Sequence, residues 1–174
     1  MKGAFDFFMN DKYSENIRYF LSVLREYPTA VSEVKGSPKY PYINGRVSFY
    51  QTELGVLVFS QFFGLPTSDE VCKKRFFAFH IHSGDSCTGN GEDAFADAGQ
   101  HYNPDNCPHP EHAGDLLPLL ENGGWAFELF LTDGFTVSEI IGRTVIVHIG
   151  YDDFTSQPSG NAGEKIACGV IEAF

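Results

Sequence analysis

Histidine is the residue type whose placement points most directly to chemistry in this chain. Five of the six histidines lie between Phe79 and Asp115, in the motifs F-H-I-H, H-Y-N-P and P-H-P-E-H-A-G-D. The sixth, His148, ends a second apolar run further along the chain. Neutral imidazole is a good ligand for copper, zinc, iron and nickel. This clustering therefore predicts a transition-metal site.

One group of histidines has the geometry expected of a copper ligand set. Residues 75–82 alternate as a strand does, so His80 and His82 point to the same side, about 7 Å apart, while the apolar side chains between them face the core. His148 can add a third nitrogen from the end of another strand, and His101 a fourth from a long loop. Copper(II) prefers such a tetragonal set of four nitrogens.

A second group of side chains is suited to zinc. His109, His112 and Asp115 follow one another at intervals of three residues on a loop rich in proline and glycine. Adding His101 gives three nitrogens and one carboxylate oxygen, which is the closed tetrahedral set typical of structural zinc. His101 would then serve both metals, because an imidazole that has lost both ring protons can bridge two cations.

The elements that must position these ligands are mostly short strands. Strands without intervening helices favour an antiparallel sandwich or barrel. The segment 83–112 is too long for an ordinary loop of a compact domain and carries ligands, which indicates a functional loop. Apolar alternation interrupted by Gly, Pro and Asn predicts strands at 30–36, 43–51, 55–63, 75–82, 125–131, 143–149 and 166–174.

One helix is predicted near the N-terminus, over residues 14–27, with Ser14 as its N-cap. Its apolar side chains recur at every third or fourth position and form one stripe. The main interpretation packs this stripe on the strand domain, and the alternative uses it as a dimer contact. We expect an N-terminal extension, residues 1–28, followed by one domain, residues 29–174. The stripe consists of Ile17, Phe20, Leu21 and Leu24.

The amino-acid composition limits the kinds of molecule that this protein can bind. Hydrophobic residues make up 43% of the 174 residues, which supports a packed core, and the formal net charge is −11. This charge argues against nucleic acid and against anionic membrane surfaces. No signal peptide and no membrane-spanning run is recognisable, so we expect a cytoplasmic protein, with export left open. A homodimer is left open beside a monomer.

The motifs together resemble those of the copper,zinc superoxide dismutases, over roughly residues 29–174. The resemblance implies a Greek-key β-sandwich or barrel of the immunoglobulin-like type, all-β, with about eight antiparallel strands and long metal-binding loops. The matching stretches occur in the family's order: F-H-I-H at 79–82, H-Y-N-P at 101–104, H-A-G-D at 112–115, I-I-G-R-T-V-I-V-H at 140–148, G-N-A-G at 160–163 and A-C-G-V-I at 167–171.

The resemblance also implies an activity, the disproportionation of superoxide to dioxygen and hydrogen peroxide. Copper would cycle between two oxidation states, and a structural zinc would hold the bridging His101, which leaves and rejoins copper as it takes up and releases a proton. The source of the copper is not indicated. The implied copper ligands are His80, His82, His101 and His148. The implied zinc ligands are His101, His109, His112 and Asp115.

The resemblance also implies the role of one further residue and of one pair of cysteines. Asp152 matches an aspartate that joins a copper-ligand histidine to a zinc-ligand histidine, as supporting carboxylates do around metals. Cys87 and Cys168 match the disulfide that anchors the long loop to the barrel. Cys72 and Cys107 match no partner, and we expect free thiols there.

Lys165 is the main departure from the family's pattern, which has an arginine beside copper at this position. The positive charge is kept, but the planar fork of donors is lost. Superoxide is an anion and the chain is strongly acidic, so we expect copper and Lys165 to form a local positive funnel, with Lys165 as a flexible point charge. The loop 153–160 contains no Lys or Glu, and the zinc loop is short but has lost no ligand.

Two other functional classes compete with the enzyme. The first is a metal-binding relative with weak or no dismutase activity, whose copper position is poorly loaded or holds zinc, and which stores copper or binds zinc. The second is a structural module on the same sandwich, since a fold alone does not give a function. The complete set of ligand residues argues strongly against the structural module.

Overall fold

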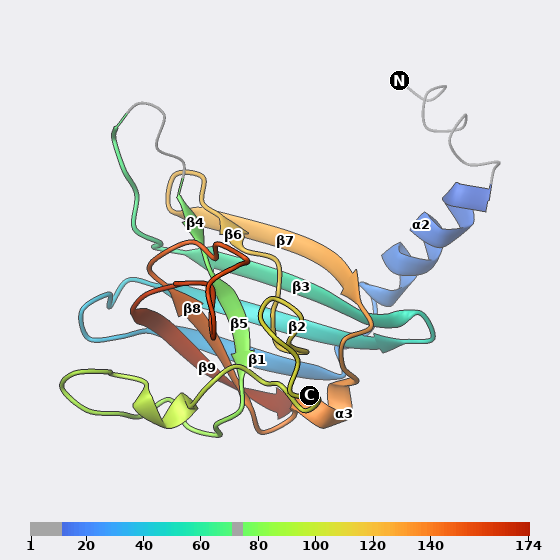
Figure 1. Ribbon diagram of the computed structural model, residues 1–174. Helices are drawn as coiled ribbons and strands as arrows, with labels where there is room; N and C mark the ends of the chain where they lie inside the picture. The colour runs from blue at the N-terminus through green and yellow to red at the C-terminus, as the bar shows by residue number, and fades with distance from the viewer. Residues whose placement is uncertain (1–11, 71–74) are drawn as a thin grey trace.

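The computed structural model describes residues 12–70 and 75–174, which form a barrel-like β domain preceded by a helix (Figure 1). Two short helical segments interrupt the later loops. The strands are β1 (Ala30–Gly36), β2 (Asn44–Thr52), β3 (Gly55–Phe63), β4 (Phe76–Phe77), β5 (Phe79–His82), β6 (Leu119–Leu120), β7 (Trp125–Thr132), β8 (Thr144–His148) and β9 (Lys165–Ala173). The helical segments are α2 (Lys12–Val23), η1 (Ala96–Ala98) and α3 (Val137–Ile140).

Seven of these strands form one curled antiparallel sheet in the order β5-β8-β9-β1-β2-β3-β7, and β4 pairs with β6 in a second, two-stranded sheet. The chain passes from β3 to β5 at the opposite end of the sheet, returns to β7 beside β3, and then runs to β8 beside β5. Such long returns are the mark of a Greek key. The prediction of an all-β, antiparallel Greek-key domain is therefore confirmed.

The core lies inside the curl of the sheet and is built from alternate apolar side chains. Phe62 of β3 and Phe79 of β5 meet edge to face across this interior, with ring centroids 5.7 Å apart. Phe77, Phe79 and Ile81 are fully buried, as the strand alternation predicted. Because these aromatic and branched side chains fix the position of β5, the histidines between them are held on a rigid strand.

The predicted strand 75–82 is in fact divided at Ala78. The Ala78 N–H donates to the carbonyl of Gly150, and its own carbonyl accepts from the N–H of His148. These bonds tie the approach to β5 to the end of β8, and both strands carry metal-site histidines. Strand β6 and helix α3 were not predicted, because two-residue and four-residue elements are too short to display a period. The predicted N-terminal helix is present as α2, and α3 and η1 are additional to it.

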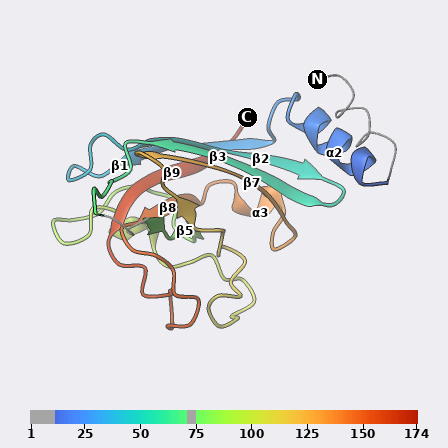
Figure 2. The ribbon, with the colours of Figure 1, turned by 90° about the horizontal axis from the view of Figure 1, so that it is seen from above.

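Helix α2 differs from its prediction at both ends and in its packing. It runs from Lys12 to Val23 and not over residues 14–27, so Ser14 is not its N-cap. Ile17 and Leu21 are 57% and 53% exposed, so the expected packing of the stripe on the strand domain was wrong for these two side chains. Phe20 is half-buried. Figure 2 shows α2 beyond the end of the sheet, on the side away from the long loops.

None of the helices in the described part of the chain is long and apolar enough to cross a membrane.

Glu128 of β7 is an acidic side chain on the inner side of the sheet. It pairs with the fully buried Ser60 of β3, and one of its carboxylate oxygens accepts a hydrogen bond of 3.0 Å from the N–H of Leu120. The other oxygen is buried without a partner among the described residues. Burial raises the pKa of Glu128 to about 7, although the bond from Leu120 opposes the shift. The folded state therefore favours the protonated carboxyl.

We expect Glu128→Gln to stabilise the protein at alkaline pH. The folded-state pKa lies above the unfolded value, so the free energy of unfolding falls as pH rises from about 4.5 through about 7 and is flat beyond. After discounting for partial exposure, the variant should gain about 1–2 kcal/mol at pH 8.5. Denaturant titrations between pH 5.5 and 8.5 measure this. Glu53→Gln, in the exposed β2–β3 turn, is the control. A gain that does not grow with pH contradicts the assignment.

Candidate metal centre

The outer edge of β5 brings distant loop residues to its histidines. Ile81 donates its N–H to one loop segment and accepts a hydrogen bond from another at its carbonyl, both at 2.8 Å. As a result, His82 lies opposite His101, and His80 lies opposite Asp115, in isolated antiparallel bridges. Two ligand-bearing loops are therefore placed by ordinary backbone pairing with a single strand.

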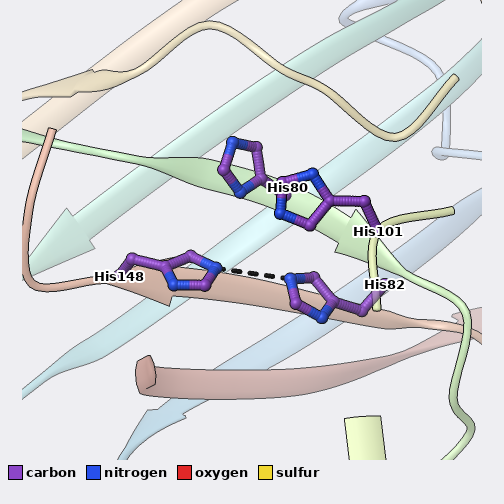
Figure 3. A group of neighbouring side chains, drawn as sticks. All are labelled: His80, His82, His101 and His148. Atoms are coloured by element: carbon purple, nitrogen blue, oxygen red, sulfur yellow. Dashed lines mark hydrogen bonds between the residues drawn. The ribbon is translucent and has the colours of Figure 1, made fainter. Parts of the chain in front are cut away.

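Four histidines converge at the first site, as Figure 3 shows. His80 and His82 come from β5, with ring centroids 6.4 Å apart, and His148 ends the neighbouring β8. His101 enters from the loop, and one nitrogen from each of the four rings lies within 4.8 Å of the others. All four residues are buried. The structure thus brings together the set that the sequence predicted for copper.

The second site lies beside the first one and has a mixed donor set. His101, His109, His112 and Asp115 each offer one atom within 4.8 Å of the others. One oxygen of Asp115 lies 3.0 Å from Nδ1 of His109 and 3.3 Å from Nδ1 of His112. Three imidazole nitrogens and one carboxylate form the set that zinc prefers in closed structural sites. This is the set that the sequence predicted for zinc.

His101 is the side chain that belongs to both sites. Its Nδ1 lies 2.7 Å from an oxygen of Asp115 and 3.3 Å from Nδ1 of His112. Its Nε2 is buried without a hydrogen-bond partner in the described part of the chain, and the ring centroid of His80 is 4.0 Å from its own. The two nitrogens of one imidazole therefore serve two different donor sets.

Unpaired buried nitrogens provide a test of whether metals fit these sites. Nδ1 of His80 and Nε2 of His101 are buried and lack hydrogen-bond partners among residues 12–70 and 75–174. Nδ1 of His109 is also buried without a hydrogen bond in this part of the chain, although an oxygen of Asp115 lies 3.0 Å away. Such orphaned atoms are costly unless a ligand satisfies them. The Nε2 atoms of His82 and His148 are 3.3 Å apart, a spacing compatible with two nitrogens bound at about 2.0–2.1 Å to one ion. The residues present therefore fit two cations.

Backbone carbonyls fix the orientation of two of the histidine rings. Nδ1 of His82 donates to the carbonyl of Gly99 at 2.9 Å, and Nδ1 of His148 donates to that of Gly163 at 2.9 Å. A donor role for Nδ1 leaves Nε2 as the unprotonated nitrogen of each ring. Metal-binding histidines are commonly oriented in this way, by a hydrogen bond from the ring nitrogen that does not face the metal.

Asp152 links the two sites through its carboxylate. Nε2 of His80 lies 2.9 Å from one oxygen, and Nε2 of His109 lies 2.8 Å from the other. Burial by itself would raise the pKa of Asp152, but hydrogen bonds from His80, Phe154 and His109 lower it below its usual value. An ionised carboxylate thus accepts from one ring of each site. The position is the one that the family resemblance implied.

Two supporting residues near His109 were not predicted from the sequence. The side-chain amide of Gln157 accepts from the N–H of His109 at 3.0 Å and donates to its carbonyl at 2.7 Å. Gly160 has a φ of +66°, and a Cβ there would collide with the carboxylate of Asp152. An amide-bearing side chain and a glycine in a loop are too common for the sequence alone to reveal these roles.

Burial lowers the pKa of His80, His82 and His148 and so keeps these three rings neutral. It lowers the pKa of His148 to about 3, with the nearby His80 adding to the effect, and it lowers the pKa of His82 well below its usual value. Only the neutral imidazole has a lone pair for a metal. These rings are therefore available as ligands throughout the physiological pH range.

The predicted disulfide between Cys87 and Cys168 is confirmed, and it joins the long loop to β9 across 81 residues. Closing a loop of this length typically stabilises a fold by about 2–4 kcal/mol. Cys107 is a free cysteine, as expected. Cys72 lies outside the described residues.

Lys165 is held more firmly than the sequence suggested. It lies opposite His148 in the pairing of β8 with β9. Its ammonium group is 2.7 Å from a carboxylate oxygen of Asp93 and donates to the carbonyl of Phe95 at 3.0 Å, and its side chain is only 13% exposed. The prediction that Lys165 is a flexible point charge was therefore wrong, because Asp93 and Phe95 of the long loop fix the position of its ammonium group.

Comparisons with known proteins agree with this geometry. Residues 43–171 match the sequence profile of the family "Copper/zinc superoxide dismutase (SODC)". The "Superoxide dismutase [Cu-Zn]" of Schizosaccharomyces pombe is 34% identical over 158 residues, which cover 82% of this chain and 96% of that protein. The "Superoxide dismutase [Cu-Zn] 2" of Aquifex aeolicus is 32% identical over 142 residues, covering 73% and 78% respectively.

A longer relative and a solved structure complete the comparison. The "Extracellular superoxide dismutase [Cu-Zn]" of Mus musculus is 34% identical over 146 residues, and the chain spans 55% of its length. The structure "Cu/Zn superoxide dismutase from Brucella abortus" superposes with a TM-score of 0.68 at 28% identity, covering 82% of this chain and 99% of that one.

A Greek-key barrel that holds a four-histidine set and a three-histidine, one-carboxylate set through one shared imidazole defines a two-metal protein of the copper and zinc class. With the profile match and the identities above, the chain belongs to the copper/zinc superoxide dismutase family.

We expect Asp152→Ala to weaken the binding of both metals, because its carboxylate orients one ring in each site. Loss of such a support typically costs about 10–100-fold in metal affinity. Competition with chromophoric chelators, performed separately for copper and zinc, measures the two affinities. Asp153→Ala is the matched control, since that carboxylate accepts hydrogen bonds from its own turn, including Ser156. Loss of affinity for only one metal would contradict the linking role.

Proposed function

We propose that this protein disproportionates superoxide at a copper held by His80, His82, His101 and His148. The observation that carries the proposal is the placement of His101, whose two nitrogens face two different donor sets. Copper, when bound, supplies the one-electron oxidation and reduction that convert superoxide to dioxygen and hydrogen peroxide. Membership of the family supports the same reaction.

We assign zinc to His101, His109, His112 and Asp115. A carboxylate among three imidazoles supports this choice, because the set leaves no vacant position in a tetrahedral site. The four-nitrogen set, in contrast, suits copper. His101 then holds Nδ1 toward the zinc set, so its ring cannot turn freely.

His101 is the residue that we assign to proton transfer. Nε2 is the atom that can take up a proton, and it is buried next to the other copper-set rings. Because Nδ1 is held by the zinc set, protonation at Nε2 does not release the ring from its place. Proton transfer at a fixed, buried nitrogen is a form of general acid–base catalysis.

Lys165 is the cation that we assign to attracting the anionic substrate. It faces His148 across β8 and β9, and it supplies positive charge in a chain whose net charge is −11. A local positive group can draw in a small anion even where the whole molecule repels it. Asp93 pairs with this lysine and reduces the effect.

The alternative, a metal-binding relative with weak or no dismutase activity, is not favoured. Both donor sets are complete, and the copper set is buried on a rigid strand pair. Cytoplasmic location, homodimer formation and the division at residue 28 remain predictions.

The two-site assignment predicts different metal losses for two single variants. His148→Ala removes a ligand of the copper set only, so it should lose copper and activity while retaining near-stoichiometric zinc. Asp115→Ala removes a ligand of the zinc set only and should lose zinc first. Elemental analysis of the purified proteins, together with superoxide consumption, measures both outcomes. If the two variants lose the same metal, the assignment is wrong.

The role of Lys165 predicts a graded series of rates. At low ionic strength, Lys165→Glu should lower the second-order rate most, Lys165→Ala less, by about two- to tenfold, and Lys165→Arg should preserve it. The wild-type rate should fall as salt rises, and this slope should flatten in Lys165→Ala. Pulse-generated superoxide decay measures the rates. Lys35→Ala, which removes the same charge where the side chain contacts Asn44, is the control, and equal effects would refute the role.

A further inference from the structure

Asp93 is the one acidic side chain that contacts Lys165 among the described residues. Its two carboxylate oxygens have separate partners. One accepts a hydrogen bond of 2.9 Å from the N–H of Phe95, and the other lies 2.7 Å from the ammonium group of Lys165. The Asp93 side chain is 39% exposed, whereas that of Lys165 is 13% exposed. The carboxylate is therefore the more exposed member of the ion pair.

We infer that Asp93 is a positioning residue that sets how strongly the copper site attracts anions, by partly neutralising the charge of Lys165. The inference rests on the proposed function, in which Lys165 attracts the substrate. The effect comes from the ion pair of this chain.

The charge state of Asp93 supports a fixed ion pair. Burial by itself would raise the pKa of Asp93, but the hydrogen bonds from Lys165 and from the N–H of Phe95 lower it below its usual value. The carboxylate is therefore ionised at neutral pH. The pair has no net charge, so an approaching anion meets a dipole, whose attraction falls off faster than that of a single cation.

Removing the carboxylate charge should leave Lys165 in place. Its ammonium group keeps its second bond, to the carbonyl of Phe95. The disulfide between Cys87 and Cys168 still attaches the same loop to β9, three residues from Lys165. The N–H of Asp93 also keeps its hydrogen bond to the side-chain oxygen of Asn90, and the carbonyl of Asp93 still accepts from the N–H of Asn90. The lysine then remains as an uncompensated cation on β9, where its backbone is paired with that of His148.

The test measures the affinity of azide for the copper-loaded protein, followed by its charge-transfer absorption band at low ionic strength. We expect Asp93→Asn to tighten azide binding by about two- to fivefold, as one unit charge on the order of 10 Å away would do through a partly screened surface. This gain should shrink in 0.5 M salt, where the Debye length is only about 4 Å. Asp93→Ser, whose hydroxyl can still accept from the N–H of Phe95, should behave similarly.

Two controls separate the ion pair from net charge. Asp97→Asn removes the same charge from the same loop, but this side chain accepts from Thr88 and does not contact Lys165. It should change azide affinity by less than half as much as Asp93→Asn. In the double variant Lys165→Ala/Asp93→Asn, azide affinity should return to near the wild-type value, because the two removed charges are opposite and lie 2.7 Å apart, so their effects on the anion nearly cancel.

The azide affinities of these variants either support or overturn the role of Asp93. Tighter azide binding in Asp93→Asn, with less than half that effect in Asp97→Asn and near wild-type affinity in the double variant, supports the inference. The inference is overturned if Asp97→Asn has half the effect or more, if the double variant differs from wild type as much as Asp93→Asn does, or if binding is unchanged or weaker in Asp93→Asn and Asp93→Ser. Superoxide consumption by the wild-type protein is measured separately, so a failure of the proposed function is recognised without reference to azide.

Discussion

The arrangement of both sites depends on the sharing of one imidazole. His101 can serve two donor sets only if its ring is fixed, since a rotation would move both nitrogens at once. Its Nδ1 is held by Asp115, and the backbone bridge to His82 holds its Cα against β5. The loop, the edge strand β5 and the carboxylate of Asp115 together limit the rotation of the His101 ring.

Asp152 extends the same constraint to the rest of the centre. A single carboxylate accepts from His80 on a strand and from His109 on a loop. Displacement of either ring would therefore disturb the other. The clamp of Gln157 on the backbone of His109 and the close approach of Gly160 to the carboxylate add to this rigidity. A preorganised metal site of this kind requires support beyond its direct ligands.

The loop that contains His101 is attached to β9 by one covalent and one ionic connection. Cys168 and Lys165 lie three residues apart on that strand, and they bind Cys87 and Asp93 of the loop. Both connections lie close to His148, which pairs with Lys165. The ordering of the loop, the position of the cation and the last copper-set histidine are therefore physically coupled. The same few contacts therefore contribute both to the stability of this loop and to the attraction of anions by Lys165.

The sequence by itself determined the donor types, the strand alternation that aligns His80 with His82, and most strand positions, because these follow from local periodicity and from motifs. Tertiary structure alone decided the partner of Lys165, the break at Ala78 and the exposure of Ile17. Each of these depends on contacts between segments far apart in the chain. A local pattern gives the direction of a side chain from its own element, but not what another segment places in front of it.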